Sequence, residues 1–376
     1  YDVESYNTTA IYNLATAMQR MGRRERASEL LAKFQALRES GAGTSLGLNY
    51  LEQGRYAEAI PSTGAEGELV DPADPKVTFR ESDIGLRSKR LRIASGPSGA
   101  VIFDYDNDND LDIASTNPAR ILRNSDGMFA DVTASSGDFG RVRSAQGSVI
   151  IAGDFDGDSL AALFIAGTRS VSLYKNLGKG RFADVTKAAQ IPAKTGSLPP
   201  MTAAFVDVDH DGDLDIVIGG TARTGNRLFR NNGNSTFSDY SSGAKIHKDI
   251  AAISVIPTDF DNRRDVDLLF LAADGRPALY RNVRNTTFAD VAGDVGLDQT
   301  RAWTSASAGD FNKDSFIDFF FGISGSRGLF AVSDGRGKFK LIDAPAGTEN
   351  STAAQFLDYD NDGLLDLVVY TSNGFA

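Results

Sequence analysis

Apolar residues recur at spacings of three and four along the first 60 residues, which is the spacing of one face of an α-helix. They fall into two runs separated by Gly22, and a helix is expected over each run. The residues that define this pattern are Ala10, Leu14, Ala17, Met18, Leu30, Leu31, Phe34 and Leu37. The pattern therefore predicts a pair of helices that turn at Gly22.

A shorter second unit follows 32 residues later. The corresponding residues are Leu14 and Leu46, Gly22 and Gly54, and Ala27 and Ala59. The matched stretches, Ala10–Leu37 and Thr44–Ile60, resemble tetratricopeptide repeats, whose period is about 34 residues. An ordinary helical hairpin is the alternative. We expect residues 1–60 to be helical and residues 61–75, which are rich in Pro, Gly and acidic residues, to be a linker.

From residue 76 onward, short runs of β-branched and aromatic residues alternate with turn residues, which predicts strands. A nine-residue acidic loop occurs six times in this region, at intervals of 48 to 53 residues. The six loops are DYDNDNDLD from Asp104, DFDGDSLAA from Asp154, DVDHDGDLD from Asp207, DFDNRRDVD from Asp259, DFNKDSFID from Asp310 and DYDNDGLLD from Asp358. Such regular recurrence indicates a repeat architecture.

A second signature follows the loops: a strand ending in Arg-Asn or Lys-Asn, a Gly/Asn turn and a strand with a Phe. Four strands in about 50 residues are typical of a propeller blade. We therefore predict a mainly β fold over residues 76–376, a propeller of four-stranded blades, about six or seven in the intact ring. Lys76–Gly85 resembles a lone fourth strand, so Ser351–Tyr370 is expected to supply its missing strands, and the ring is expected to be truncated at the C-terminus.

The loop spacing D-x-D-x-D-G-x-x-D suits calcium. Side chains at positions 1, 3 and 5 can converge on one centre, Gly at position 6 permits a sharp turn, and position 9 can add a bidentate carboxylate. Magnesium keeps more of its water, and softer metals prefer His or Cys. A set of acidic surface turns is the alternative, but six copies in phase with the strands favour metal binding. We predict about three to five calcium ions per chain.

The loops differ in how many ligands they retain. The predicted ligands are Asp104, Asp106, Asp108 and Asp112 in the first loop; Asp154, Asp156 and Asp158 in the second; Asp207, Asp209, Asp211 and Asp215 in the third; Asp310, Asn312, Asp314 and Asp318 in the fifth; and Asp358, Asp360, Asp362 and Asp366 in the sixth. Ala162 ends the second loop without a carboxylate, which leaves binding there undecided. Arg263 replaces a ligand of the fourth loop, where we expect its guanidinium to substitute for the cation and no metal to bind.

The acidic loops, together with stretches such as LYKNLGKGRFADVT, resemble FG-GAP and VCBS repeats over about Lys76–Ala376. The motif of integrin-α propellers that combines Phe-Gly with Gly-Ala-Pro is not evident, so the VCBS form is closer. Helical repeats before such a propeller are similar to bacterial proteins with an ASPIC/UnbV-type C-terminal region, which this chain lacks. The resemblance implies a calcium-stabilised, mostly extracytoplasmic interaction scaffold without naming its ligand.

Composition excludes several classes of function. The chain has 39 basic and 50 acidic residues, a net charge of −11, which opposes a broad nucleic-acid surface. It has no Cys, which excludes disulfides, zinc-thiolate sites and thiol nucleophiles. No apolar run reaches the roughly 18 residues of a membrane helix. His210 and His247 are the only imidazoles, and no nucleophile or phosphate-binding motif occurs, so we predict no enzyme.

We expect a non-catalytic calcium-binding scaffold, secreted, periplasmic or on the cell surface, that binds a protein or glycan. Weak loop sites fill at extracellular calcium concentrations, which supports that location. The alternatives are a lectin-like carbohydrate-binding propeller and a non-catalytic part of a polysaccharide-active or lipid-active enzyme. Trp303, the only Trp, is expected to pack in the interior, and His210 to be a solvated loop residue. The recurring Phe129, Phe182, Phe237, Phe288 and Phe339 are expected to pack between blades.

Overall fold

The computed structural model describes residues 8–21, 23–39, 99–142, 149–167, 170–192, 202–221, 224–246, 250–284, 286–360, 363–371 and 374–375. The chain divides into two compact units, Tyr1–Lys76 and Val77–Ala376. The predicted second helical repeat, Thr44–Ile60, the linker 61–75 and the ring-closing segment Lys76–Gly85 lie outside the described residues. The boundaries proposed for these segments therefore stay predictions.

The first unit contains the predicted pair of helices, α1 (Thr8–Arg20) and α2 (Arg24–Glu39). Its small core is formed by Ile11 and Ala15 of α1 and Leu30 of α2, all buried. The rings of Tyr12 and Phe34 lie 5.4 Å apart and extend this contact. One helical pair fits a tetratricopeptide unit and an ordinary hairpin equally well, so the repeat stays a prediction. No helix among the described residues is long and apolar enough to span a membrane.

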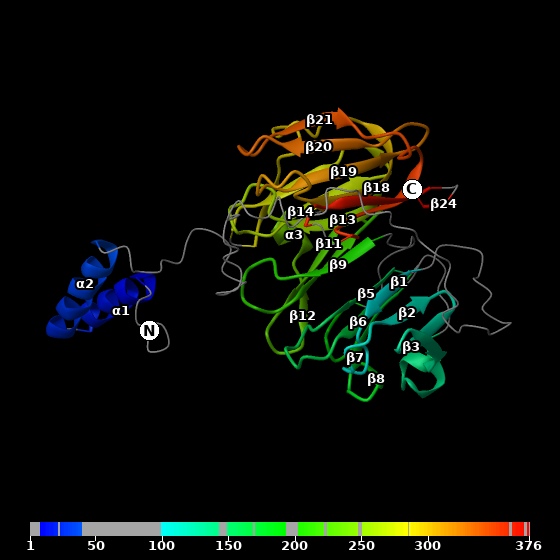
Figure 1. Cartoon of the computed structure of the whole chain (residues 1–376). Coiled ribbons are helices and arrows are strands. Elements are labelled where there is room, and N and C mark those ends of the chain that lie inside the picture. The colour runs from blue at the N-terminus through cyan, green and yellow to red at the C-terminus, as the bar shows by residue number, and fades with distance from the viewer. Residues whose placement is uncertain are drawn as a thin grey trace. The chain divides into compact units, whose positions relative to one another are not determined.

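The strands of the second unit form successive antiparallel sheets, which we call blades 1 to 6 (Figure 1). Blade 1 contains β1 (Ala100–Phe103), β2 (Asp112–Thr116), β3 (Ala119–Ser125) and β4 (Met128–Asp131). Blade 2 contains β5 (Val149–Gly153), β6 (Ala162–Ala166), β7 (Val171–Asn176) and β8 (Phe182–Asp184). Blade 3 contains β9 (Thr202–Val206), β10 (Asp215–Gly219), β11 (Arg227–Asn231) and β12 (Phe237–Asp239).

Blade 4 contains β13 (Ala252–Thr258), β14 (Asp267–Ala272), β16 (Ala278–Asn282) and β17 (Phe288–Asp290). Blade 5 contains β18 (Arg301–Gly309), β19 (Asp318–Ile323), β20 (Leu329–Ser333) and β21 (Phe339–Asp343), and β15 (Asp274–Gly275) pairs with β18. Blade 6 contains β22 (Ser351–Leu357), β23 (Asp366–Thr371) and β24 (Gly374–Phe375). The short helices are η3 (Thr133–Ser135), η4 (Phe139–Arg141) and α3 (Ser241–Ala244). The predicted four-stranded arrangement is thus confirmed for blades 1 to 5, blade 6 has three strands among the described residues, and the number of blades in the intact ring stays a prediction.

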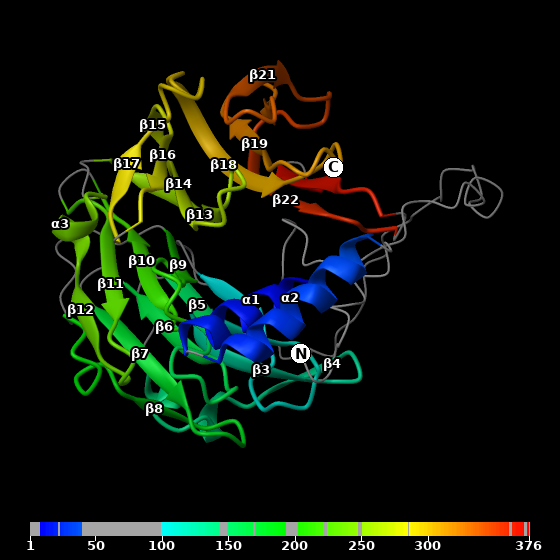
Figure 2. The ribbon, with the colours of Figure 1, turned by 90° about the vertical axis from the view of Figure 1, so that its left-hand side faces the viewer.

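The first strands of consecutive blades lie side by side, so the blades are arranged around a common axis (Figure 2). Polar contacts join these strands: Val255 N donates to Thr202 Oγ1 at 3.1 Å, and Phe356 N donates to Ser307 Oγ at 3.0 Å. The second strand of each blade pairs with the first and lies farther from this axis. Every residue of β6, β10, β14 and β19 is buried, as expected for strands covered on both faces.

The hydrophobic cores lie between blades and combine residues of two neighbours. The ring of Phe237 in blade 3 lies 5.7 Å from Phe155 of blade 2, and Phe339 in blade 5 lies 6.0 Å from Phe260 of blade 4. Phe182 and Phe288 are equally buried, whereas Phe129 of blade 1 is partly exposed. The prediction that the recurring Phe residues pack between blades is confirmed for those four blades.

Trp303 is an interior residue, as predicted. It is buried, its ring centroid lies 5.3 Å from that of Phe321, and its Nε1 donates to the carbonyl of Gly275 at 2.9 Å. A buried indole with a satisfied N–H contributes packing and a single hydrogen bond. The only Trp of the chain therefore lies away from any exposed binding surface.

Candidate functional site

The six acidic loops connect the first and second strands of the six blades, and their nine positions are numbered from the first Asp. The position 1 carboxylate folds each described loop around itself. In loop 3, Asp207 Oδ1 accepts the N–H of Asp211 at 3.2 Å, and Oδ2 accepts the N–H of Gly212 at 3.0 Å. The same two bonds recur at Asp104, Asp154, Asp259 and Asp310. Position 1 thus shapes the loop besides offering oxygens to a cation.

Two positions of the loops have left-handed backbone. The described residues at position 4 are Asn107, Gly157, His210, Asn262 and Lys313, with φ between 54° and 69°. Those at position 6 are Asn109, Ser159, Gly212, Arg264, Ser315 and Gly363, with φ between 63° and 92°. The preference for Gly and Asn at these positions reflects this conformation. His210 is half exposed, as predicted, and its Nε2 lies 3.8 Å from Asp265 of loop 4.

Position 9 has a structural role that the sequence analysis missed. The oxygens of fully buried Asp215 accept the N–H of Val208 at 3.0 Å and of Asn231 at 2.7 Å. Asp112 makes the equivalent bonds in loop 1, at 2.9 and 2.7 Å. This carboxylate therefore joins the loop to the third strand of its own blade. The sequence contained a signal for this role, because position 9 is the first residue of the apolar second strand and is therefore expected to be buried.

Burial makes these position 9 carboxylates weak acids. Desolvation raises the pKa of Asp215 to about 7, of Asp267 to about 8 and of Asp318 to about 6. Neighbouring carboxylates of the same loops act in the same direction. A cation in the loop would oppose both effects, because it favours the charged form.

Acidic oxygens converge in five of the loops. In each group, one oxygen from each of three residues lies within 4.8 Å of the others. The groups are Asp104, Asp106 and Asp108; Asp154, Asp156 and Asp158; Asp207, Asp209 and Asp215; Asp259, Asp261 and Asp267; and Asp358, Asp360 and Asp366. Loops 2 and 4, which depart from the pattern, are thus as convergent as the others. Asp362 lies outside the described residues, and Asp112 and Asp211 lie outside these groups.

The fifth loop differs because Asn312 occupies position 3. Its Oδ1 accepts the N–H of Asp314 at 2.9 Å. Among the described residues, Asp310, Asp314 and Asp318 form no convergent group of three acidic oxygens. The prediction that the Asn312 amide oxygen acts as a metal ligand in this loop stays a prediction.

Position 3 contributes buried carboxylate oxygens that lack a hydrogen-bond partner. The Oδ1 atoms of Asp106, Asp209 and Asp261 are buried and accept no hydrogen bond from the described residues. The side chains of Asp209 and Asp261 are only 9% and 8% exposed. An unsatisfied buried oxygen of this kind is costly, and hard oxygen donors are what calcium binds. These residues therefore fit a calcium ion at loops 1, 3 and 4.

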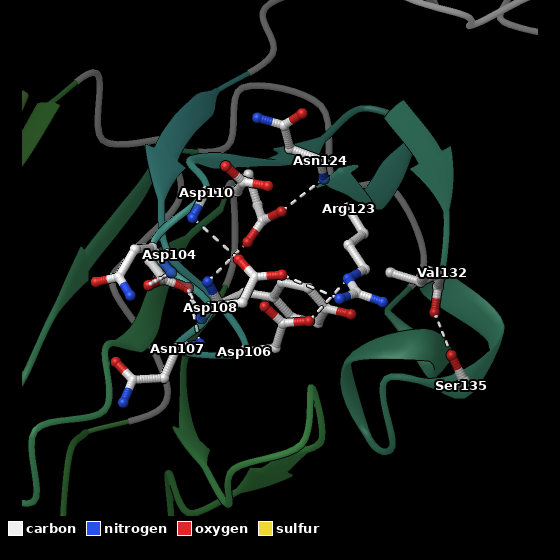
Figure 3. Close-up of polar contacts among 12 residues, drawn as sticks. Asp104, Asp106, Asn107, Asp108, Asp110, Arg123, Asn124, Val132 and Ser135 are labelled. Atoms are coloured by element: carbon white, nitrogen blue, oxygen red, sulfur yellow. Dashed lines mark hydrogen bonds and ion pairs between the residues drawn. The ribbon is translucent and has the colours of Figure 1, made fainter. Parts of the chain in front are cut away.

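A basic residue from the third strand lies against the acidic group in blades 1 to 4. In blade 1, Arg123 Nε lies 2.9 Å from Asp106 Oδ2 and its Nη2 lies 3.0 Å from Asp108 Oδ2 (Figure 3). The equivalent pairs are Lys175 with Asp156 and Asp158, Arg230 with Asp209 and Asp211, and Arg281 with Asp261. These residues are the Arg or Lys of the Arg-Asn and Lys-Asn signature. Sequence analysis recognised the signature but not this contact.

The expectation for Arg263 was wrong in one respect. The guanidinium that lies against the loop 4 carboxylates is Arg281, whose Nε is 2.7 Å from Asp261 Oδ2 and which also stacks over Phe260 at 5.2 Å. Among the described residues, Arg263 contributes a backbone N–H to Asp259 and no ion pair. The third strand brings Arg281 to this point, because strand pairing places it opposite the loop. The expectation that loop 4 binds no metal is untested, and the convergent carboxylates of Asp259, Asp261 and Asp267 count against it.

Several solved structures are similar to this chain. An Agrocybe aegerita lectin that recognises non-reducing terminal N-acetylglucosamine is 16% identical, with 73% of this chain and 75% of that chain covered, at a TM-score of 0.49. BBS1N in complex with ARL6DN is 12% identical, with 75% and 79% covered, at a TM-score of 0.48. The V. cholerae biofilm matrix protein Bap1 is 16% identical, with 66% and 39% covered, at a TM-score of 0.38. Similarities this distant transfer no function.

Comparison of the sequence with protein families identifies the repeats. No curated protein matches the chain. The family model of the FG-GAP-like repeat matches residues 154–218, 207–270, 259–321 and 310–369. Each match begins at position 1 of one acidic loop and continues through the next loop into its second strand, and together the matches span more than half of the chain. The chain therefore belongs to the FG-GAP-like repeat family.

Proposed function

We propose that the protein is a non-catalytic interaction scaffold whose propeller is stabilised by calcium. The observation that carries this proposal is the set of buried, unpartnered Oδ1 atoms of Asp106, Asp209 and Asp261. Each lies in a loop where further carboxylates converge, a donor set of hard oxygens that suits calcium. Membership of the FG-GAP-like repeat family supports the same assignment.

Calcium would be held by positions 1, 3 and 5 of the loops, with position 9 as an additional donor where it is acidic. When bound, the ion would neutralise carboxylates that otherwise repel one another and would satisfy their free oxygens. Because this donor set exists only in the folded chain, calcium would stabilise the fold by mass action. The chain's own residues set the geometry: position 1 folds the loop, and position 9 ties it to the third strand. We expect about three to five ions per chain, as the loop sequences predict.

The scaffold would act outside the cytoplasm and would bind a protein or glycan partner through loops on a rigid ring. Support for this location is the expected weakness of several sites, which would fill only at extracellular calcium concentrations. Buried Trp303 cannot serve as an exposed platform for a sugar ring, so we favour a protein partner over a glycan. The tetratricopeptide-like helices would add a second surface for a peptide or helix.

Calorimetric titration of chelator-stripped protein, with bound metal counted by elemental analysis, tests the proposal. We expect saturable calcium binding and an increase in melting temperature. The variant Asp209→Asn is expected to remove one ion, because it alters a convergent, buried ligand of loop 3. Asp213→Asn is the matched control, since it makes the same change in the same loop outside the convergent group. Absence of calcium binding by the native chain would show that the loops are only acidic turns.

A further inference from the structure

A polar cavity lies between loop 3 and loop 4, on two neighbouring blades. Its volume is about 670 Å³, which is within the range of sites for small molecules. Its ionisable lining residues are the carboxylates Asp209, Asp211 and Asp265, the guanidinium groups of Arg230, Arg264 and Arg284, and the imidazole of His210. Three guanidinium groups thus gather in one cavity of a chain whose net charge is −11.

The basic groups of this cavity reach solvent, whereas two of its carboxylates do not. The side chains of Asp209 and Asp265 are 9% and 7% exposed and are paired with arginines. The exposed side chains are Arg284 at 68%, His210 at 49%, Arg230 at 41% and Asp211 at 36%. A ligand entering the cavity would therefore meet the guanidinium groups of Arg284 and Arg230 and the imidazole of His210, with Asp211 as the one partly exposed carboxylate. Such a lining is suited to an oxyanion.

Arg284 occupies a position that is glycine in blades 2, 3 and 5 and Asp126 in blade 1. The position lies two residues after the signature Asn, and its occupants elsewhere include Gly178, Gly233 and Gly335, all with positive φ. Arg284 adopts the same left-handed backbone, with φ of 65°. For a residue with a side chain this conformation costs on the order of 1 kcal/mol. A bulky cation that is kept at a strained position next to a cavity points to a function.

A buried carboxylate fixes Arg284 in place. Its Nε lies 3.1 and 3.2 Å from the two oxygens of Asp265, at position 7 of loop 4. Blade 2 has an apolar counterpart of this pair, because a Cβ on Gly178 would lie 3.7 Å from Leu160, also at position 7. Blade 4 thus has an ion pair at the place where blade 2 has a Leu and Gly contact. Only Nε of Arg284 is engaged among the described residues, so its terminal amino groups remain available to a ligand.

Arg264 is a second arginine with left-handed backbone. It stands at position 6 with φ of 63°, where the other loops have only small residues, Gly212, Gly363, Asn109, Ser159 and Ser315. Blade 4 therefore places an arginine at two left-handed positions, and both arginines line the same cavity. Arg264 and Arg284 lie on different segments of blade 4 and meet at the same cavity.

We propose that this cavity binds a small polar ligand through an oxyanion, a carboxylate or a sulfate. Arg264 and Arg284 contact the oxyanion, Arg230 and His210 form the opposite wall from blade 3, and Asp265 is a positioning residue that orients Arg284. The two arginines that contact the oxyanion, Arg264 and Arg284, belong to neither the convergent carboxylates nor the Arg-Asn signature. The blade 3 wall is shared with the proposed calcium function, because Arg230 is the signature Arg and Asp209 and Asp211 are predicted calcium ligands of loop 3.

The test is a calorimetric titration of the full chain, at one fixed calcium concentration, with D-glucuronate, sodium sulfate and uncharged D-glucose. The double variant Asp265→Leu/Arg284→Gly gives blade 4 the Leu160 and Gly178 pair of blade 2, so it is expected to fold with undiminished stability. We expect both anions to bind the native chain and to bind this variant at least about 10-fold more weakly. Arg264→Gly, which relieves the left-handed strain, is expected to weaken binding in the same way.

Three results would overturn the proposal. The first is no saturable binding of either anion by the native chain. The second is glucose binding as tight as glucuronate binding, because recognition would then not involve the charge. The third is unchanged anion affinity in a folded double variant or, if that variant does not fold, in Arg264→Gly. Loss of sulfate and glucuronate binding together would support a general oxyanion site, and loss of glucuronate alone would assign it to carboxylates.

Discussion

Asn231 Nδ2 in blade 3 donates to the main-chain carbonyl of Phe155 in loop 2 of blade 2, at 2.7 Å. The same amide donates at 3.2 Å to the carbonyl of Leu214 in its own loop. One side chain therefore joins the acidic loops of two blades. The signature Asn residues of blades 2 and 4 make the equivalent interblade bonds: Asn176 to the carbonyl of Tyr105 at 2.9 Å, and Asn282 to that of Val208 at 2.8 Å.

Asn231→Ala should destabilise the propeller by about 2–3 kcal/mol, because it leaves two carbonyl groups without this donor in a buried position. Equilibrium unfolding in urea measures the loss. Asn232→Ala is the adjacent control, because the Asn232 amide makes a solvent-exposed hydrogen bond to nearby Thr236 Oγ1 at 2.9 Å. This variant should change the free energy of unfolding by no more than about 0.5 kcal/mol. Equal effects of the two variants would show that the interblade bond contributes little.

Phe237→Ala should destabilise the protein by about 3–5 kcal/mol, the range for removing a buried aromatic ring. The ring is buried between blades 2 and 3 and contacts Phe155. Met128→Ala is the control, because that side chain is 55% exposed at the edge of blade 1. Thermal unfolding of both variants is the measurement. If Phe237→Ala lowers the free energy of unfolding by less than about 1 kcal/mol, the neighbouring side chains must repack into the space left by the ring.

The parts of this structure that were predictable from sequence are those encoded locally. Loop spacing and turn residues sufficed to locate all six loops, and apolar runs such as that of β10 located the strands. The packing of Phe237 followed from its recurrence in phase with the loops. Each of these features depends on residues close to one another in the chain.

The roles that were not predicted depend on strand register. Arg281 reaches Asp261 only because β14 and β16 pair with Leu268 opposite Tyr280, which places two distant residues together. Arg263 was nearer in sequence and was wrongly assigned to this contact. Asp215 as a metal ligand stays a prediction, but the sequence did not predict that its oxygens accept two backbone N–H groups, one of them from the third strand. Non-local pairing of this kind leaves no periodic signal in a single sequence.

Arg123→Gln should raise the calcium affinity of loop 1 several-fold. The guanidinium of Arg123 forms ion pairs with Asp106 and Asp108. A calcium ion that binds the same carboxylates must weaken these ion pairs, so the arginine competes with calcium. Arg120→Gln is the control on the same strand, because Arg120 pairs with Asp131, outside the loop. Calcium titration calorimetry compares the two variants with the native chain. Reduced affinity of Arg123→Gln would instead show that the arginine organises the carboxylates for the ion.

The chelator-stripped protein should become less stable as the pH rises from about 5 to about 8. The folded-state pKa values of Asp318, Asp215 and Asp267, about 6, 7 and 8, lie above the value near 3.9 of an unfolded Asp. In that interval the folded chain binds more protons than the unfolded chain, so its stability falls with increasing pH. Melting temperatures of the stripped protein across this range measure the slope.

Asp267→Asn should flatten this pH dependence and stabilise the stripped protein at pH 8. Asp267 Oδ1 accepts the N–H of Asn282 at 2.7 Å, while its buried Oδ2 has no hydrogen-bond partner among the described residues. An amide keeps the accepting oxygen and replaces the other with an uncharged group, so it imitates the protonated acid. Asp343→Asn, at an exposed position of β21, is the control and should leave the slope unchanged. If Asp267→Asn keeps the native slope, the proton uptake belongs to other loops, and Asp215→Asn becomes the variant that identifies them.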